Sequence, residues 1–189
     1  MGHRGSDTIR AATTADAPAL ARVHVTAWRE SYAGIVPDAL LAKLSIEGRT
    51  AMWTRILNDP SDFDFTAVHV AERDSEVIGF GACGLQRTAA LKEQGYDGEV
   101  TAIYVLRPFQ KQGVGAALMQ SMSLTLSGGG LSGLSLWVLR DNAVARRFYE
   151  QIGGVVVGEK EDTRQETVLI EVAYGWPDLA RLHRLISHG

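Results

Sequence analysis

The sequence is poor in features that would tie it to an oxidising compartment or to a membrane. Its single cysteine, Cys83, excludes an intrachain disulfide and fits a reducing setting. No apolar run approaches the roughly 20 residues that cross a bilayer, and residues 1–7 lack the apolar segment of a signal peptide. We therefore expect a cytoplasmic protein with no membrane partner.

The sequence also lacks a large excess of either charge: its net charge at pH 7 is −3 and its sequence pI is about 5.9. A protein that neutralises many phosphates needs an excess of Lys and Arg, so no nucleic-acid partner is expected. The 5 histidines show no metal-ligand spacing, and no metal is expected. Cys83 falls in a strand pattern, where a core position is favoured over the role of a nucleophile.

A chain of 189 residues, 46% of them hydrophobic, can bury one sizeable core. Helical spacing of apolar residues predicts helices over 14–34, 37–44, around 52–57, 113–126 and 142–152. Strand patterns are found at 8–12, 66–72, 77–85, 99–106, 134–138, 155–157 and 167–174. This order indicates an α/β layered domain with a mixed sheet over 8–175, a flexible segment at 1–7 and an amphipathic tail at 176–189. In the helix over 142–152, we expect Val144, Phe148 and Ile152 to face the core.

A strand that runs into a glycine-opened helix is the most informative segment. Residues 99–106 form the strand, and Gly113 and Gly115 open the helix after a short turn. The first turn of a helix leaves backbone N–H groups unpaired and carries the positive end of the helix dipole. Because glycine has no Cβ, ligand oxygens can approach this turn closely, and Lys111 adds a positive charge. The pattern predicts a phosphate or pyrophosphate site.

Two common nucleotide motifs do not fit this turn. The Walker motif needs Lys-Ser or Lys-Thr at its last glycine, whereas Ala116 and Ala117 follow Gly115. A dinucleotide fingerprint needs a third glycine, and position 118 is Leu. A glycine pair that serves only close helix packing is the remaining alternative, and Gln110 together with the preceding strand favours the phosphate site over it.

Two segments resemble motifs of the GNAT superfamily of acetyl-coenzyme A-dependent N-acetyltransferases. Residues 110–115 read Gln-x-x-Gly-x-Gly, which is similar to that family's Arg/Gln-x-x-Gly-x-Gly/Ala motif after a strand. Residues 142–153 read Asn-Ala-x-Ala-x-x-Phe-Tyr-Glu-x-x-Gly, which is similar to its later Asn-x-x-Ala-x-x-Phe-Tyr-x-x-x-Gly segment. The resemblance implies a single α/β (α+β in some schemes) domain with a mixed, mostly antiparallel sheet of about six to seven strands flanked by helices.

The resemblance also implies acetyl-coenzyme A as a co-substrate. Backbone amides of the glycine loop would hold its pyrophosphate, and the strand before the loop would pair with its pantetheine arm. A bulge at 103–105 would aim one amide at the thioester carbonyl. The cofactor-binding residues that it implies are Ile103, Tyr104, Val105, Gln110, Lys111, Gln112, Gly113, Val114, Gly115, Ala116 and Asn142.

Acetyl transfer to an amine requires that the amine loses a proton, that an oxyanion is stabilised and that a thiolate is protonated. Glu99, at a position where many GNAT members carry a catalytic glutamate, is the candidate base through water, and a solvated carboxylate at the strand start is an equal alternative. The amide of Val105 or Leu106 is the candidate oxyanion donor. Tyr149 is the candidate acid, which we favour over a purely core role.

The acceptor side is less well defined. Residues 28–37 resemble a Trp-x-x-x-Tyr-x-Gly-Ile-x-Pro segment of a GNAT subgroup, which implies that Trp28 and Tyr32 line the acceptor pocket. A core role for both is supported at least equally. Glu30, Asp64 and Glu72 are unranked candidates for attracting a cationic amine.

The expected reaction is therefore direct attack of a primary amine, on a small molecule or a protein, on acetyl-coenzyme A in a ternary complex. The sequence does not identify the amine. A non-catalytic coenzyme A-binding regulatory module on the same fold is the main alternative, and a nucleotide-phosphate enzyme is disfavoured by the missing Walker motif. The apolar face of the tail further indicates a homodimer.

Overall fold

The computed structural model describes residues 7–59, 65–164 and 167–187. Its strands are β1 Thr8–Ala11, β2 Phe65–Arg73, β3 Glu76–Leu85, β4 Gly98–Val105, β5 Leu134–Leu139, β6 Val155–Arg164 and β7 Thr167–Trp176. Its α-helices are α1 Ala17–Tyr32, α2 Asp38–Ala42, α3 Ile46–Asn58, α4 Ala89–Glu93, α5 Val114–Gly128, α6 Ala143–Gln151 and α7 Leu179–Ser187. Residues 1–6 of the segment 1–7 that was expected to be flexible lie outside the described residues, as does Asp64, a candidate for attracting the amine. Asp7 is described and is paired with Arg73.

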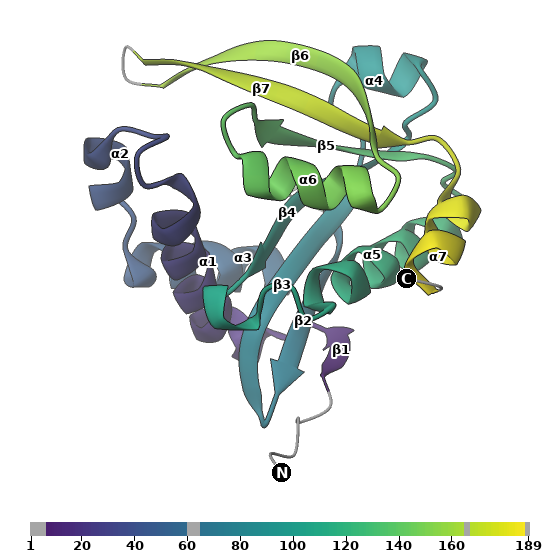
Figure 1. The fold of residues 1–189 in the computed structure, drawn as a ribbon. Helices are drawn as coiled ribbons and strands as arrows, with labels where there is room; N and C mark the ends of the chain where they lie inside the picture. The colour runs from purple at the N-terminus through teal and green to yellow at the C-terminus, as the bar shows by residue number, and fades with distance from the viewer. Residues whose placement is uncertain (1–6, 60–64, 165–166, 188–189) are drawn as a thin grey trace.

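One sheet of 7 strands runs through the domain in the order β1-β2-β3-β4-β5-β7-β6. Every neighbouring pair is antiparallel except β4 and β5, which are parallel. The expected mixed, mostly antiparallel sheet is confirmed. In Figure 1, β5, β6 and β7 are turned away from the direction of β2 and β3, so the two halves of the sheet diverge beyond the junction of β4 with β5.

Two hydrophobic clusters cover opposite faces of the first half of the sheet. Helices α1 and α3 contribute Leu20, Trp53 and other side chains that pack on Phe80 and Val70. Helix α5 lies on the other face, where Met122 and further apolar side chains meet β4, β5 and β7. The helices therefore hold β4 from both sides, which fixes the strand that the site depends on.

The helix α6 has a different buried face from the one predicted. Its beginning is as expected, because the Asn142 side chain accepts a hydrogen bond from the Ala145 amide at 3.2 Å and caps the helix. Val144, expected in the core, is 66% exposed, whereas Tyr149 is buried beside Ile152. The prediction for Val144 is wrong because a short helix packs along a single stripe, and Ala145, Tyr149 and Ile152 form that stripe.

The apolar tail forms α7 and packs on its own chain. Leu179 and Leu182 are buried in the same cluster as Met119 and Trp176. The expectation of a second subunit rests on Leu179, Leu182, Leu185 and Ile186; the first two are covered within the chain, whereas Leu185 is 44% exposed. The tail therefore completes the core around α5.

We predict that Leu182→Ala lowers the free energy of unfolding by about 2–5 kcal/mol, because Leu182 is 1% exposed and its removal leaves a cavity. Leu185→Ala is the matched control on the same helix. Leu185 is 44% exposed, so its replacement by alanine should lower the free energy of unfolding by about 1 kcal/mol or less. Denaturant titration followed by circular dichroism measures both, and equal costs would show that α7 is not part of the core.

Candidate functional site

The site begins where β4 and β5 part. The two strands are paired only at Gly98 with Leu134 and at Glu99 with Ser135. The Asp97 carboxylate fixes this junction, since it accepts hydrogen bonds from the backbone amides of Ser132 and Gly133 at 2.9–3.1 Å. Beyond the junction, no pairing of β4 with β5 is found in the described part of the chain.

The parting leaves backbone groups of β4 without a neighbouring strand. The Leu106 amide donates to the Ile78 carbonyl of β3 at 3.0 Å. Because residues of an antiparallel pair alternate between facing the partner and facing away, Tyr104 also faces β3, and the amides of Ile103 and Val105 point to the opposite edge. That edge is the gap left by β5, so the Ile103 and Val105 amides point into it, and no strand pairs with them there among the described residues. Leu106, one of two candidate oxyanion donors, is already engaged.

The strand bulge lies earlier than predicted. The register of β3 with β4 shifts between Ala82 and Cys83, which leaves Thr101 as the extra residue of β4. Its hydroxyl donates to the Ala82 carbonyl at 3.2 Å. The bulge expected at 103–105 is therefore found at 101, and because it shifts the alternation of side chains by one residue, Glu99 before it and Tyr104 after it face the same cavity.

The glycine turn has the backbone of an anion site. Gly113 is the N-cap residue of α5 with φ of 89°, a left-handed conformation that favours glycine, and no side chain caps the helix. Lys111 also has a positive φ of 58°. A Cβ at Gly113 would meet no atom within 4 Å, so this side of the turn is open. At Gly115 the missing Cβ instead admits the Phe148 ring, which would lie 3.2 Å from it.

Side chains fold back to hold this turn in place. The Gln110 amide donates to the Val105 carbonyl at 2.9 Å, and the Gln112 amide donates to the Pro108 carbonyl at 2.8 Å. Arg73 of β2 donates to the Gln112 side chain at 2.9 Å. Gln110 and Gln112 therefore shape the loop, a role that a sequence motif does not distinguish from ligand contact.

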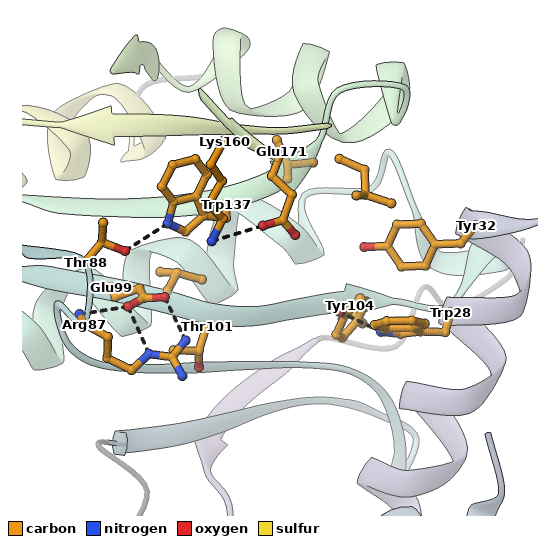
Figure 2. Close-up of a pocket in the computed structure, with 13 residues that line it drawn as sticks. Trp28, Tyr32, Arg87, Thr88, Glu99, Thr101, Tyr104, Trp137, Lys160 and Glu171 are labelled. Atoms are coloured by element: carbon orange, nitrogen blue, oxygen red, sulfur yellow. Dashed lines mark hydrogen bonds and ion pairs between the residues drawn. The ribbon is translucent and has the colours of Figure 1, made fainter. Parts of the chain in front are cut away.

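A pocket of about 410 Å³ lies beside the junction, on the side of α1 (Figure 2). Its walls come from α1, β4, β5, β6, β7 and the segment after β3. The lining residues are Trp28, Tyr32, Arg87, Thr88, Glu99, Val100, Thr101, Tyr104, Trp137, Val138, Leu139, Lys160 and Glu171. Of the sequence candidates, it gathers Trp28, Tyr32, Glu99 and Tyr104, while the glycine turn, Asn142 and Tyr149 are not among its lining residues.

Glu99 is a buried carboxylate held by one arginine. The Arg87 guanidinium donates to it at 2.8 and 3.1 Å, and the Arg87 backbone amide donates at 3.1 Å. The Glu99 side chain is 6% exposed and that of Arg87 is 51% exposed. These contacts fix the direction of the carboxylate, and they replace the interpretation of Glu99 as a solvated strand-start residue. Arg87 itself carries no motif that would identify it in the sequence.

An aromatic wall forms the α1 side of the pocket. The Trp28 indole donates to the Tyr104 hydroxyl at 2.8 Å, and Tyr32 meets the Trp28 ring edge-on. His24 stacks on Tyr104 with ring centroids 5.3 Å apart, and its Nδ1 accepts from the Trp53 indole at 3.2 Å. Burial, with a smaller effect of Arg49, lowers the pKa of His24 to about 3, so this histidine is neutral and stabilises the wall.

Tyr149 lies on the α6 side of the gap. Burial raises the pKa of its hydroxyl above the usual value of 10, and nearby Tyr104 adds to the rise. Among the described residues, the Tyr149 hydroxyl has no hydrogen-bond partner. It is therefore a neutral donor whose proton is not engaged, although the ring packs in the core against Phe148 and Tyr174.

Two of the three unranked acidic candidates, Glu30 and Glu72, do not line the pocket. Glu30 accepts from the backbone amide of Arg107, and Glu72 is paired with Arg10 of β1. Asp64 lies outside the described residues. The second carboxylate of the pocket is instead Glu171 of β7, which the strand pattern of the sequence does not distinguish from any other outward-facing residue.

Neither a metal cluster nor a membrane-spanning helix is found among the described residues. No group of three or more His, Cys, Asp or Glu side chains there is placed to hold a metal ion. No helix among residues 7–59, 65–164 and 167–187 has the length and apolar character that a membrane crossing requires.

The comparisons with known proteins agree on one family. The sequence profile of the acetyltransferase (GNAT) family matches residues 26–154. An N-acetyltransferase of Bacillus subtilis (strain 168), YuaI, which is described as uncharacterized, is 33% identical over 95% of this chain and 98% of its own length. An uncharacterized N-acetyltransferase of Archaeoglobus fulgidus is 33% identical over 75% of this chain and 88% of its own.

Solved structures share the fold at lower identity. The PaiA N-acetyltransferase of Thermoplasma acidophilum in complex with coenzyme A has a TM-score of 0.67 at 23% identity, covering 88% of this chain and 98% of that one. The putative acetyltransferase YncA of Salmonella typhimurium with acetyl-coenzyme A has a TM-score of 0.65 at 19% identity, covering 92% and 94%.

Proposed function

Because this chain belongs to the GNAT family of acetyltransferases, we propose that it transfers the acetyl group of acetyl-coenzyme A to a primary amine by direct attack in a ternary complex. The observation that carries the proposal is the gap between β4 and β5, with amides of β4 pointing into it and an open helix N-terminus after the same strand. The relatives are named as N-acetyltransferases, and none of the comparisons supports a non-catalytic regulatory module.

The residues present fit a ligand that combines a diphosphate with an amide-bearing arm. Gly113, Val114, Gly115 and Ala116 would bind the diphosphate through unpaired amides of the first turn, with Lys111 nearby. The amides of Ile103 and Val105 would bind the arm in the gap, as a neighbouring strand would. Acetyl-coenzyme A carries both groups, and when bound it supplies an activated acetyl thioester.

The two sides of the gap would then have separate chemical tasks. Glu99, oriented by Arg87, would take a proton from the acceptor amine through water. The amide of Ile103 or Val105 would donate to the developing oxyanion, since both face the gap and Leu106 does not. Tyr149, whose hydroxyl is neutral, would give its proton to the departing thiolate, although burial makes it a weaker acid than a free tyrosine.

The acceptor would approach from the side of α1. The pocket there combines Trp28, Tyr32 and Tyr104 with two carboxylates, Glu99 and Glu171. Aromatic faces and carboxylates both attract cations, so the pocket favours an amine that arrives protonated. Glu99 lies in this pocket, as a base for such an amine must.

We predict that Gly113→Glu raises the dissociation constant for coenzyme A by about 100-fold or more, because the side chain would place bulk and negative charge in the turn. Gly128→Glu adds the same side chain at the other end of α5, where a Cβ also meets no atom within 4 Å, and should leave binding unchanged. Isothermal calorimetry on both variants provides the comparison. Equal affinities for the two would remove the turn from the binding site.

We predict that Tyr149→Phe lowers kcat by about 100-fold while the dissociation constant for coenzyme A stays the same, because only the proton donor is lost. Tyr96→Phe, a buried tyrosine outside the gap, is the matched control. Steady-state release of free thiol, measured with a panel of primary amines, tests both. Unaltered turnover in Tyr149→Phe would exclude it as the acid.

A further inference from the structure

The acceptor pocket already contains an alkylammonium group, which belongs to the chain itself. Lys160 of β6 reaches into the pocket, where its Nζ lies 3.2 Å from the Glu171 carboxylate. The same Nζ lies 4.2 Å from the centre of the Trp137 ring. Figure 2 shows the three side chains converging above the β4 strand that carries Glu99.

A carboxylate beside an aromatic face is the combination that binds alkylammonium groups. Within this pair the carboxylate is the more buried partner, because the Glu171 side chain is 14% exposed and that of Lys160 is 45% exposed. Lys160 and Glu171 lie directly opposite each other in the pairing of β6 with β7, so both side chains are on the same face of the sheet. An ion pair with a half-exposed cation contributes little stability, and another cation can replace Lys160 at low cost.

The second carboxylate of the pocket does not offer the same site. Glu99 is bound by both the guanidinium and the backbone amide of Arg87; displacing the Arg87 side chain would break two hydrogen bonds, and the bond from the backbone amide would remain. Lys160 is bound to Glu171 by one ion pair. The pocket therefore has one locked carboxylate and one whose cation is exchangeable.

We propose that Glu171 and Trp137 form a subsite for a second positive charge on the acceptor, and that Lys160 is the resident occupant that such an acceptor displaces. The inference rests on the proposed acetyl transfer, because it specifies the acceptor of that reaction. The acceptor class is an aliphatic diamine or a longer polyamine. One ammonium group occupies the subsite, while the other amine lies on the Glu99 side and reacts.

The test compares equilibrium binding of two probes that differ by one amino group, 1,5-diaminopentane and n-pentylamine, without any turnover. Lys160→Met removes the resident cation and keeps an unbranched side chain against Trp137. It should lower the dissociation constant for the diamine about threefold to tenfold and change that for pentylamine less, because one ammonium group cannot occupy the subsite and the Glu99 side together. Glu171→Gln should raise the diamine value about tenfold, again with a smaller effect on pentylamine.

Lys92→Met in α4, which makes the same change in net charge outside the pocket, is the control and should alter neither value. The subsite is wrong if Lys160→Met weakens the diamine, or tightens both amines equally. Acetylation of Lys160 itself, seen by mass spectrometry after incubation with acetyl-coenzyme A, would also contradict it, because the lysine would then be a substrate.

Turnover separates this inference from the proposed function. Thiol release with pentylamine, together with unchanged diamine binding in the Lys160 and Glu171 variants, would overturn the subsite and keep the acetyltransferase. If the variants show the expected binding pattern but no amine causes thiol release, the proposed reaction is overturned and the cation subsite is supported.

Discussion

The parting of β4 from β5 directly after Glu99 and Ser135 is the constraint on which the site depends. A β-strand in the middle of a sheet normally has both edges paired, and a buried amide without a partner costs about 1–3 kcal/mol. Here the second edge of β4 is left open beyond Glu99. The domain tolerates this because β3 pairs with β4 along its whole length and helices pack on both faces. The open edge is consequently where we propose that an extended ligand binds.

The same strand separates the two substrates in the proposed reaction. Its backbone at Ile103 and Val105 faces the gap, while the side chains of Glu99 and Tyr104 face the acceptor pocket. The bulge at Thr101 makes this division workable, because it resets the alternation of side chains between the start and the end of the strand. One strand can therefore offer donors to a thioester and a base to an amine from opposite directions.

Much of this arrangement was predictable because it depends on local rules. A left-handed glycine at a helix start and an asparagine cap on α6 follow from nearest-neighbour geometry, and Gly113 and Asn142 adopt these roles. A mixed and mostly antiparallel sheet could be predicted, but the order of its strands could not. The buried face of α6 was mistaken at Val144 because nine residues of helix give too short a period to define a stripe.

The pocket itself could not be predicted, since its residues meet through tertiary contacts. Arg87 and Glu99 are brought together by the pairing of β3 with β4, and Lys160 and Glu171 by the register of β6 with β7. Neither pair has a sequence spacing that marks it as functional. Likewise, Leu106 was a reasonable oxyanion donor until the register showed its amide bound to Ile78.

Amide hydrogen exchange of β4, followed by NMR with and without coenzyme A, tests the central claim most directly. In the free protein, the amides of Ile103 and Val105 should exchange much faster than that of Tyr104, which is bonded to β3. Coenzyme A should slow the exchange of Ile103 and Val105 and leave Tyr104 unchanged. Protection of all three to the same extent in the free protein would contradict the account, because the edge of β4 would then already be closed.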